Sequence, residues 1–349
     1  MRRLQVSLLL LTEASASGVF DVTSFGAKGD GHTDDTRAVR AAAVAAAAAG
    51  GGTLLFPGPR LSTMDCPPGT TPRPRPCAAH PGRTFCPSDP APHQCDAPKS
   101  KPACPACPKL SGTGYSTAPF NISSNVRVEI ETGATLFGST TVDWPLVSVD
   151  SVWPGYGYDG DPSYLFTHQA LLFSWRTRNI SVGGGGTIDC GGARWNNCQM
   201  NVSKPPCFGH TRPRCVVFSN STGVTFEDIT LLNSPSWTLD FSSIDHLRVR
   251  RVNVTQPGGG NRDGIDLDSC HDVVVEDSFV ASGDDTLVVK SGKDFFGRRY
   301  NRPSRDIIWR NITTGGGCAC SAHASLLCSV VLSLTFRAAN ALSCCLQTG

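Results

Sequence analysis

Charged side chains are scarce in this sequence, and neither sign is in excess. Asp, Glu, Lys and Arg make up 17% of the 349 residues and the formal net charge is +2, whereas a typical soluble domain has roughly 25% charged residues. A nucleic-acid-binding surface usually needs a clear basic excess, so we expect no nucleic-acid partner. Hydrophobic residues account for 40%, which is enough to bury a large core and excludes global disorder.

Helical patterns are also rare. The 36 glycines and 25 prolines indicate frequent turns, and only residues 37–49 have a convincing helical pattern. This segment is rich in alanine, follows the capping residues Asp34, Asp35 and Thr36, and ends at three glycines. A buried strand is predicted directly after it, over residues 53–56.

Short segments in which apolar and polar residues alternate recur through the rest of the chain. Their turn-forming first residues are Asn125, Asn179, Gly223, His246, Asp272 and Asp306. The last four are separated by 23, 26 and 34 residues, with no helical pattern between them. This spacing favours a parallel solenoid of stacked coils, because a sandwich or barrel would show turn signals about every 8 to 12 residues. The sequence therefore predicts an all-β protein, a parallel β-helix whose open end the early helix would cap.

The 16 cysteines fall into three groups. Six lie in a proline-rich stretch, residues 59–114, which has almost no aliphatic residues and is predicted to be a disulfide-linked surface insertion. Cys104 and Cys107 resemble half of a zinc site, but no second pair at finger spacing follows, so we expect no bound metal. Five more lie after Gly317, and the remaining five are spread along the predicted solenoid.

Both ends of the chain differ in character from its middle. Arg2 and Arg3, a short apolar run and small residues at 14–16 predict a secretory signal peptide over residues 1–17. Residues 318–349 lack turn signals, caps and a clean period, and we interpret them as an anomalous tail from a mispredicted or truncated gene end. Arg337 and Asn340 interrupt the apolar stretch of this tail, which argues against a stable membrane span.

Six Asn-x-Ser/Thr sequons agree with secretion, because about two would be expected by chance at typical Ser and Thr usage. They begin at Asn121, Asn179, Asn201, Asn220, Asn253 and Asn311. We therefore expect a secreted glycoprotein with disulfide bonds.

Acidic residues are concentrated between residues 261 and 292. Asp263 and the pair Asp284 and Asp285 are about 21 residues apart, close to one coil of the predicted solenoid, so we expect them to be neighbours on adjacent turns. Like charges this close disfavour joint ionisation, so at least one carboxyl pKa should be raised. A carboxylic acid with a raised pKa beside ionised carboxylates is what acid–base cleavage of a glycosidic bond requires.

Two simpler interpretations of these acidic residues stay open at this point. Asp-Gly and Gly-Asp-Asp are ordinary turn sequences. The other interpretation is a calcium ion bound by Asp266, Asp268, Asp272 and Asp277, since calcium prefers oxygen ligands, although no twelve-residue calcium loop is present. The spacing alone does not separate catalysis from turn chemistry and calcium binding.

The motifs around these aspartates resemble those of a known family. Asn-Arg-Asp-Gly-Ile-Asp at 261–266 and Gly-Asp-Asp at 283–285 resemble the first two motifs of the polygalacturonases, glycoside hydrolase family 28. Further segments that resemble this family, in the same order, lie at 20–31, 51–57, 133–145 and 234–239. The resemblance covers roughly 19–57 and 115–317, about 240 residues.

The resemblance implies a right-handed parallel β-helix that hydrolyses α-1,4 bonds between galacturonic acids in pectin, with inversion and without a cofactor. Carried over, Asp284 is the general acid, and Asp263 and Asp285 hold and deprotonate the attacking water. Asn261 and Lys290 would contact the substrate, although an ordinary solvated lysine is an equal alternative for Lys290. Further candidates for contacts with an anionic polymer are Arg262, Arg298, Arg299 and Arg302.

Two motifs of the family are missing from this chain. A Gly-His-Gly and, one coil later, an Arg-x-Lys are expected after the strand at 306–312, where the chain instead has three glycines at 315–317 and then the anomalous tail. We therefore expect weak or no activity from the chain as written. The alternative functions are a calcium-dependent pectate lyase and a non-catalytic polysaccharide-binding β-helix protein. The expected partner is a pectic polysaccharide, and the expected form is a secreted, cell-wall monomer.

Overall fold

The computed structural model describes residues 18–61, 110–111, 113–157, 165–198, 202–256, 260–315, 320–323, 335–338 and 344–345. The predicted signal peptide, residues 1–17, lies outside this part of the chain, as does most of the predicted insertion at 59–114. The two ends of the insertion pair with each other, β4 (Arg60–Leu61) antiparallel to β5 (Leu110–Ser111).

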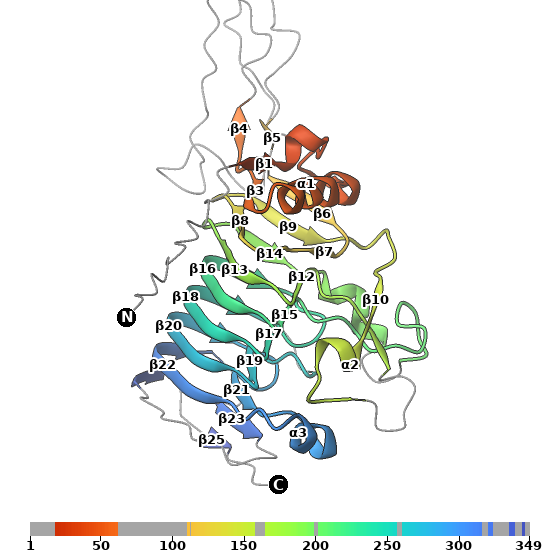
Figure 1. Cartoon of the computed structure of the whole chain (residues 1–349). Coiled ribbons are helices and arrows are strands. Elements are labelled where there is room, and N and C mark those ends of the chain that lie inside the picture. The colour runs from red at the N-terminus through yellow and green to blue at the C-terminus, as the bar shows by residue number, and fades with distance from the viewer. Residues whose placement is uncertain are drawn as a thin grey trace, which may run out of the picture.

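Parallel strands of successive coils stack along one axis and form two sheets that enclose the core (Figure 1). The eight-stranded sheet contains β7 (Phe120–Asn121), β12 (Leu172–Trp175), β15 (Val216–Ser219), β17 (Leu239–Ser242), β19 (Ile265–Asp268), β21 (Leu287–Lys290), β23 (Cys320–His323) and β25 (Cys344–Cys345). The 13-stranded sheet contains β1 (Val19–Asp21), β2 (Asp30–Asp34), β3 (Gly52–Phe56), β6 (Gly114–Thr117), β8 (Val126–Ile130), β9 (Thr135–Gly138), β13 (Arg178–Gly183), β14 (Thr187–Asp189), β16 (Thr222–Leu232), β18 (Asp245–Thr255), β20 (His271–Ala281), β22 (Arg305–Thr314) and β24 (Thr335–Ala338). This arrangement confirms the predicted all-β architecture, a right-handed parallel β-helix.

The coils turn at residues in the left-handed backbone conformation, and these residues stack in rows. One row has φ between +51° and +68° and consists of Asn125, Asn179, Gly223, His246, Asp272 and Asp306, the residues predicted to begin the repeats. A second row, with φ between +51° and +57°, consists of Arg176, Asn220, Ser243 and Ser269. A third row bends the long strands β16, β18, β20 and β22 at Asp228, Arg251, Asp277 and Asn311. Asn and Asp are frequent here because their short side chains tolerate this conformation.

Alternate residues of each strand point inward, so that like side chains stack from coil to coil. Leu239 of β17 lies beside Ile265 of β19, which lies beside Leu287 of β21, and all three are fully buried. The rings of Phe218 and Phe241 are 6.1 Å apart in neighbouring strands. Each such side chain adds roughly 1.5–3 kcal/mol of hydrophobic stabilisation, so the core is distributed along the whole axis.

The helix α1 (Thr36–Ala48) lies at the N-terminal end of the solenoid, beside β1, β3, β6 and β7 (Figure 1). It begins and ends one residue earlier than predicted. Asp34 accepts a hydrogen bond from the Thr36 amide at 3.1 Å, whereas the Asp35 carboxylate bonds to backbone amides of the 28–29 turn. The role of α1 in closing the open end of the sheets stays a prediction.

A segment between β9 and β12 crosses the outer face of the eight-stranded sheet. It contains β10 (Leu146–Ser148), α2 (Val149–Val152) and β11 (Phe166–His168), which is antiparallel to β10. Its Trp153 packs with Val217 of β15 in a small second hydrophobic cluster. We call residues 146–157 the covering segment. At its far end it meets α3 (Asp294–Tyr300), a short helix that the sequence did not predict.

Four of the five solenoid cysteines form disulfides, Cys190–Cys215 and Cys198–Cys207, which confirms the expectation of disulfide bonds. The fifth, Cys270, is buried as a free thiol. The first bridge links the end of β14 to the start of β15, and the second closes the loop after a 3-10 helix, Gly192–Cys198. A further 3-10 turn, Val22–Phe25, follows β1.

Backbone pairing continues past residue 317, where the sequence shows no repeat. β23 pairs in parallel with β21, β24 with β22, and β25 with β23. The predicted boundary between solenoid and tail stays a prediction. No helix in the part of the chain that the structure describes is long and apolar enough to cross a membrane.

Candidate active site

The turns that precede β19 and β21 bring together the aspartates singled out from the sequence. The Gly264 amide donates to the Asp285 carbonyl at 2.8 Å, and the Gly283 amide donates to the Arg262 carbonyl at 3.1 Å. Asp263 therefore lies on one coil, and Asp284 and Asp285 lie on the next coil along the axis. The neighbourhood predicted from the 21-residue spacing is confirmed.

The three carboxylates differ in their exposure to solvent. Asp263 is 5% exposed, Asp285 is half-buried and Asp284 is exposed. Burial raises the pKa of Asp263, and the neighbouring carboxylates of Asp266, Asp284 and Asp285 raise it further, while Lys290 opposes them. The expected raised pKa therefore falls on the buried member of the cluster.

Lys290 is a buried neighbour of Asp263 and has partners within the protein. It is 6% exposed, and its ammonium forms an ion pair with Asp266, which is fully buried. The Lys290 Nζ lies 3.7 Å from Asp263 Oδ2 and 3.2 Å from the centre of the Trp237 ring. The alternative of an ordinary solvated lysine is wrong, because the covering segment and Trp237 shield this end of β21. Substrate contact by Lys290 stays a prediction.

A second buried ion pair lies one strand away, on β17. Arg214 Nε is 2.7 Å from Asp240 Oδ2, and Trp153 Nε1 of the covering segment donates to the same oxygen at 2.9 Å. The Arg214 guanidinium lies between two indoles, 4.3 Å from the Trp153 ring and 4.5 Å from the Trp237 ring. Asp240 is paired in register with Asp266, so the two buried ion pairs are adjacent.

Sequence reasoning missed Asp240, Arg214 and Trp153. The available signal was Asp240 itself, which occupies the same repeat position as Asp266 on the preceding coil. Burial raises the pKa of Asp240 to about 6, with Arg214 opposing that shift. One oxygen of Asp240 and one of Asp266 are buried without a hydrogen-bond partner in the described part of the chain. The result is a low-dielectric cluster of charges directly behind Asp263.

The remaining residues predicted to contact the substrate lie in two places, some beside Asp263 and the others beyond the opposite end of β19. Asn261 is exposed, and Arg262 is half-buried with its guanidinium donating to Asn196 Oδ1. In contrast, Arg302 donates to Asp245 and to the Ser269 carbonyl, beyond the opposite end of β19. A four-residue strand is roughly 13 Å long, so Arg302 is remote from Asp263. Arg298 and Arg299 belong to α3, at the same far end.

The calcium interpretation finds no support in the geometry. Asp266 faces the covered side of β19, Asp272 pairs with His246 and Arg248, and Asp277 accepts from Asn311. The four proposed ligands therefore do not converge. Within the described ranges, no group of three or more acidic, His or Cys side chains is arranged to hold a metal ion.

A parallel β-helix with clustered carboxylates on one row of turns has the architecture of a polysaccharide-cleaving protein. The chain belongs to the glycosyl hydrolases family 28, whose family model matches residues 115–322. The match includes the two aspartate motifs and ends within β23.

Relatives in the curated proteins agree with this assignment. A probable polygalacturonase of Vitis vinifera is 29% identical over 201 residues, 56% of this chain and 39% of that protein. An endo-polygalacturonase of Pectobacterium carotovorum subsp. carotovorum is 25% identical over 223 residues, 59% of this chain and 51% of that protein. The chain thus spans about half or less of the length of these relatives.

Solved structures share the fold. An exopolygalacturonase from Thermotoga maritima superimposes with a TM-score of 0.59 and 18% identity, covering 90% of this chain and 65% of that one. An endo-xylogalacturonan hydrolase from Aspergillus tubingensis gives a TM-score of 0.52 and 14% identity, covering 88% and 60%. At these identities the similarity establishes the parallel β-helix and leaves the substrate open.

Proposed function

We propose that this protein hydrolyses α-1,4 bonds between galacturonic acid units of polygalacturonate, with inversion at the anomeric carbon. The observation that carries the proposal is the placement of Asp263 beside Asp284 and Asp285 on adjacent coils of a family-28 solenoid. The related proteins are described as polygalacturonases, which supports the choice of polymer.

The roles follow the family motifs, and the exposure of the carboxylates is compatible with them, while the raised pKa lies on Asp263, one of the two residues assigned to the water. Asp284 is exposed, so its carboxyl group can reach the glycosidic oxygen of a bound chain and protonate it as the bond breaks. Asp263 and Asp285, behind it, hold a water molecule and accept its proton. Inversion requires an acid and a base about 6.5–9.5 Å apart, with the water between them.

Lys290 and Asp266 support Asp263 in this scheme. A buried carboxylate beside two others resists ionisation, and an ion-pair partner is therefore needed if Asp263 is to act as a base. The Lys290 ammonium at 3.7 Å opposes the effect of burial and of the neighbouring carboxylates on the pKa of Asp263, which stays raised to about 8. Its own position is fixed by Asp266 and by the Trp237 ring. Asn261 and Arg262, at the outer edge, are the proposed contacts for substrate hydroxyl and carboxylate groups.

The proposed setting is outside the cell, at the cell wall, where the protein acts as a monomer. Two disulfides in the solenoid favour an oxidising compartment. Asn253 and Asn311 of two predicted sequons are exposed and accessible to glycosylation.

A reducing-end assay on polygalacturonate tests the proposal, and the rate of the parent chain is expected to be low because the Gly-His-Gly and Arg-x-Lys motifs are missing. Asp284→Asn removes the proton donor and should lower the rate by about 10²–10⁴-fold, while Asp277→Asn, at an exposed bend of β20, should retain the parent rate. Equal rates for the parent and Asp284→Asn would reject the assigned acid. Products that absorb in the ultraviolet and disappear with a chelator would indicate a lyase. Binding without turnover would indicate a non-catalytic protein.

A further inference from the structure

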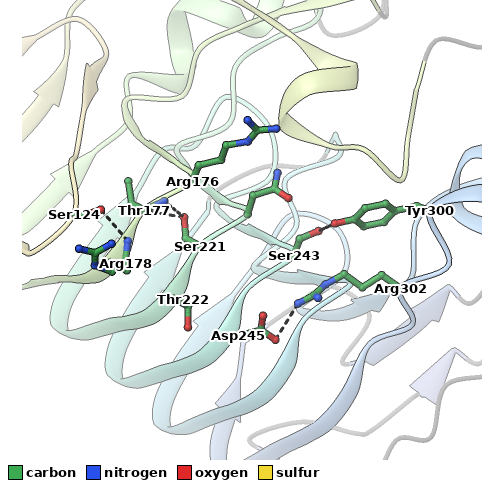
Figure 2. Close-up of a pocket in the computed structure, with 11 residues that line it drawn as sticks. Ser124, Arg176, Thr177, Arg178, Ser221, Thr222, Ser243, Asp245, Tyr300 and Arg302 are labelled. Carbon is green, nitrogen blue, oxygen red and sulfur yellow. Dashed lines mark hydrogen bonds and ion pairs between the residues drawn. The ribbon is translucent and has the colours of Figure 1, made fainter. Parts of the chain in front are cut away.

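A polar groove lies beyond the C-terminal ends of the strands of the eight-stranded sheet, whereas Asp263, Asp284 and Asp285 precede the N-terminal ends of β19 and β21. It encloses about 450 Å³, and Figure 2 shows the side chains that surround it. Those that carry the argument are Arg176, Arg178, Ser221, Ser243, Tyr300 and Arg302. No part of the proposed active site contributes to it, since its residues follow the C-terminal ends of β7, β12, β15 and β17 or belong to the end of α3 and the turn after it, whereas Asp263 precedes β19.

The groove runs along the solenoid axis and crosses several coils. Arg176, Asn220 and Ser243 are consecutive members of one row of left-handed corner residues. Neighbouring coils are about 4.8 Å apart, so the groove offers one repeat of polar groups per coil in a straight line. An extended chain fits this shape better than a compact small molecule does.

Hydrogen bonds between coils fix the walls of the groove. Thr177 Oγ1 and Ser221 Oγ are 3.0 Å apart, and the Tyr300 hydroxyl is 3.0 Å from Ser243 Oγ. Arg302 donates to Asp245 at 2.9 Å, which ties the segment after α3 to the floor of the groove (Figure 2). The groove is therefore pre-formed, and a ligand would order few side chains on binding.

Two cations between the end of β12 and the start of β13 have no carboxylate partner among the described residues. The structure shows no ion pair for Arg176 or Arg178 among the described residues, and the Arg176 guanidinium lies 4.5 Å from the centre of the Trp175 ring. Asp245 is the one carboxylate among the described lining residues, and it is already engaged by Arg302. The groove thus carries a net positive charge beside rows of hydroxyl groups, the combination that recognises carboxylates on a hydroxyl-rich chain.

We propose that this groove is a second, non-catalytic binding site for an acidic polysaccharide, in which Arg176 and Arg178 hold uronate carboxylates of an extended strand. The identity of the polymer rests on the proposed function, while the groove and its charge do not. Such a site would hold one part of a polymer, or a neighbouring strand, while the aspartates act elsewhere.

The test is calorimetric titration of oligogalacturonate into the full chain carrying Asp284→Asn, produced in a bacterial periplasm so that Asn220 on the groove wall is free of glycan. Two binding events per chain are expected. Arg176→Ala and Arg178→Ala should each weaken the second event about fivefold and together about 25-fold. The Lys pair Arg176→Lys and Arg178→Lys should restore part of it. Added salt should weaken it in the parent.

A matched control is Lys28→Ala with Arg37→Ala, which removes two exposed charges at the N-terminal end of the solenoid and should leave both events intact. The inference would be overturned by a single binding event whose affinity is the same in the Arg176→Ala, Arg178→Ala double variant. It would also be overturned if the groove bound a neutral oligosaccharide with equal affinity. Loss of the event at the aspartates with retention of the groove event would reject the proposed hydrolase and leave the groove assignment standing. Thermal unfolding of each variant shows that it is folded.

Discussion

Replacing Lys290 by methionine removes the only cation in contact with Asp263 and Asp266 in the described structure. Methionine keeps most of the apolar stem against Trp237, so the change is mainly one of charge. Removing one partner of a buried ion pair costs about 3–5 kcal/mol, and both carboxylates here are nearly or fully buried. We therefore expect Lys290→Met to lower the free energy of unfolding by about that amount at pH 9, above the pKa of about 8 to which Asp263 is raised.

The loss should depend on pH in a defined direction. Without Lys290 the folded-state pKa values of Asp263 and Asp266 rise further above those of the unfolded chain, so stability is retained at low pH and lost as pH rises through the new values. Because the pKa of Asp263 in the parent is raised to about 8, urea unfolding at pH 6 and at pH 9 measures this, and the variant should be closer to the parent at pH 6. Asp266→Asn added to Lys290→Met should recover part of the stability at pH 9.

Lys290→Met should also change the pH dependence of the hydrolysis rate. At 3.7 Å and an effective dielectric of about 20, the Lys290–Asp263 attraction is about 4 kcal/mol, part of which burial and neighbouring charges offset. The pH at which Asp263 ionises should rise by at least about 1 pH unit, and with it the acidic limb of the rate profile. An unchanged stability difference between pH 6 and pH 9, together with an unchanged rate profile, would show that Lys290 does not control the ionisation of Asp263.

Three further predictions concern stability. The pKa of Asp240 and of Asp268 is raised to about 6, so the free energy of unfolding should fall as pH rises from 4 through 6. Asp240→Asn should remove about 3 kcal/mol of that fall, which urea unfolding across this pH range measures. Buried His168 has a lowered pKa and acts in the opposite sense, equally in the parent and in the variant. Gly264→Ala would place a methyl group against the Thr286 carbonyl and the Val280 side chain. Thermal unfolding should show that the free energy of unfolding falls by about 1–3 kcal/mol. An unchanged midpoint would mean that the coils of Gly264 and Thr286 can move apart without cost. Cys190→Ser with Cys215→Ser opens a bridge across 25 residues, and chemical unfolding should show a loss of about 3 kcal/mol; a loss below about 0.5 kcal/mol would show that the stacked strands alone fix this loop.

The parts of the structure that follow the coil repeat could be predicted from the sequence. Asn179, His246 and Asp272 occupy the same corner of successive coils, and their turn-forming character marked that corner. The spacing between Asp263 and Asp284 corresponds to one coil, which is why their proximity was predictable. The corner positions and the Asp263–Asp284 spacing both depend only on neighbouring coils, so they can be predicted without knowing where distant segments pack.

The parts that depend on distant segments could not be predicted. Lys290 alternates with inward-facing residues of β21, so the pattern places it on the outer face, normally a solvated position. It is buried because the covering segment, more than 130 residues earlier in the chain, crosses that face. The ion pair of Arg214 with Asp240 depends on the same segment, through Trp153. Arg302 was placed with the substrate contacts, but the turn after α3 directs it toward Asp245.

Asp263, Asp284 and Asp285 are proposed to carry out an inverting hydrolysis. Proton NMR of the first products released from an oligogalacturonate tests it most directly, because inversion of an α-linked unit gives the β-anomer before mutarotation. We expect β-anomer from the parent and no product above background from Asp284→Asn. Initial release of α-anomer, or of an unsaturated sugar, would contradict it.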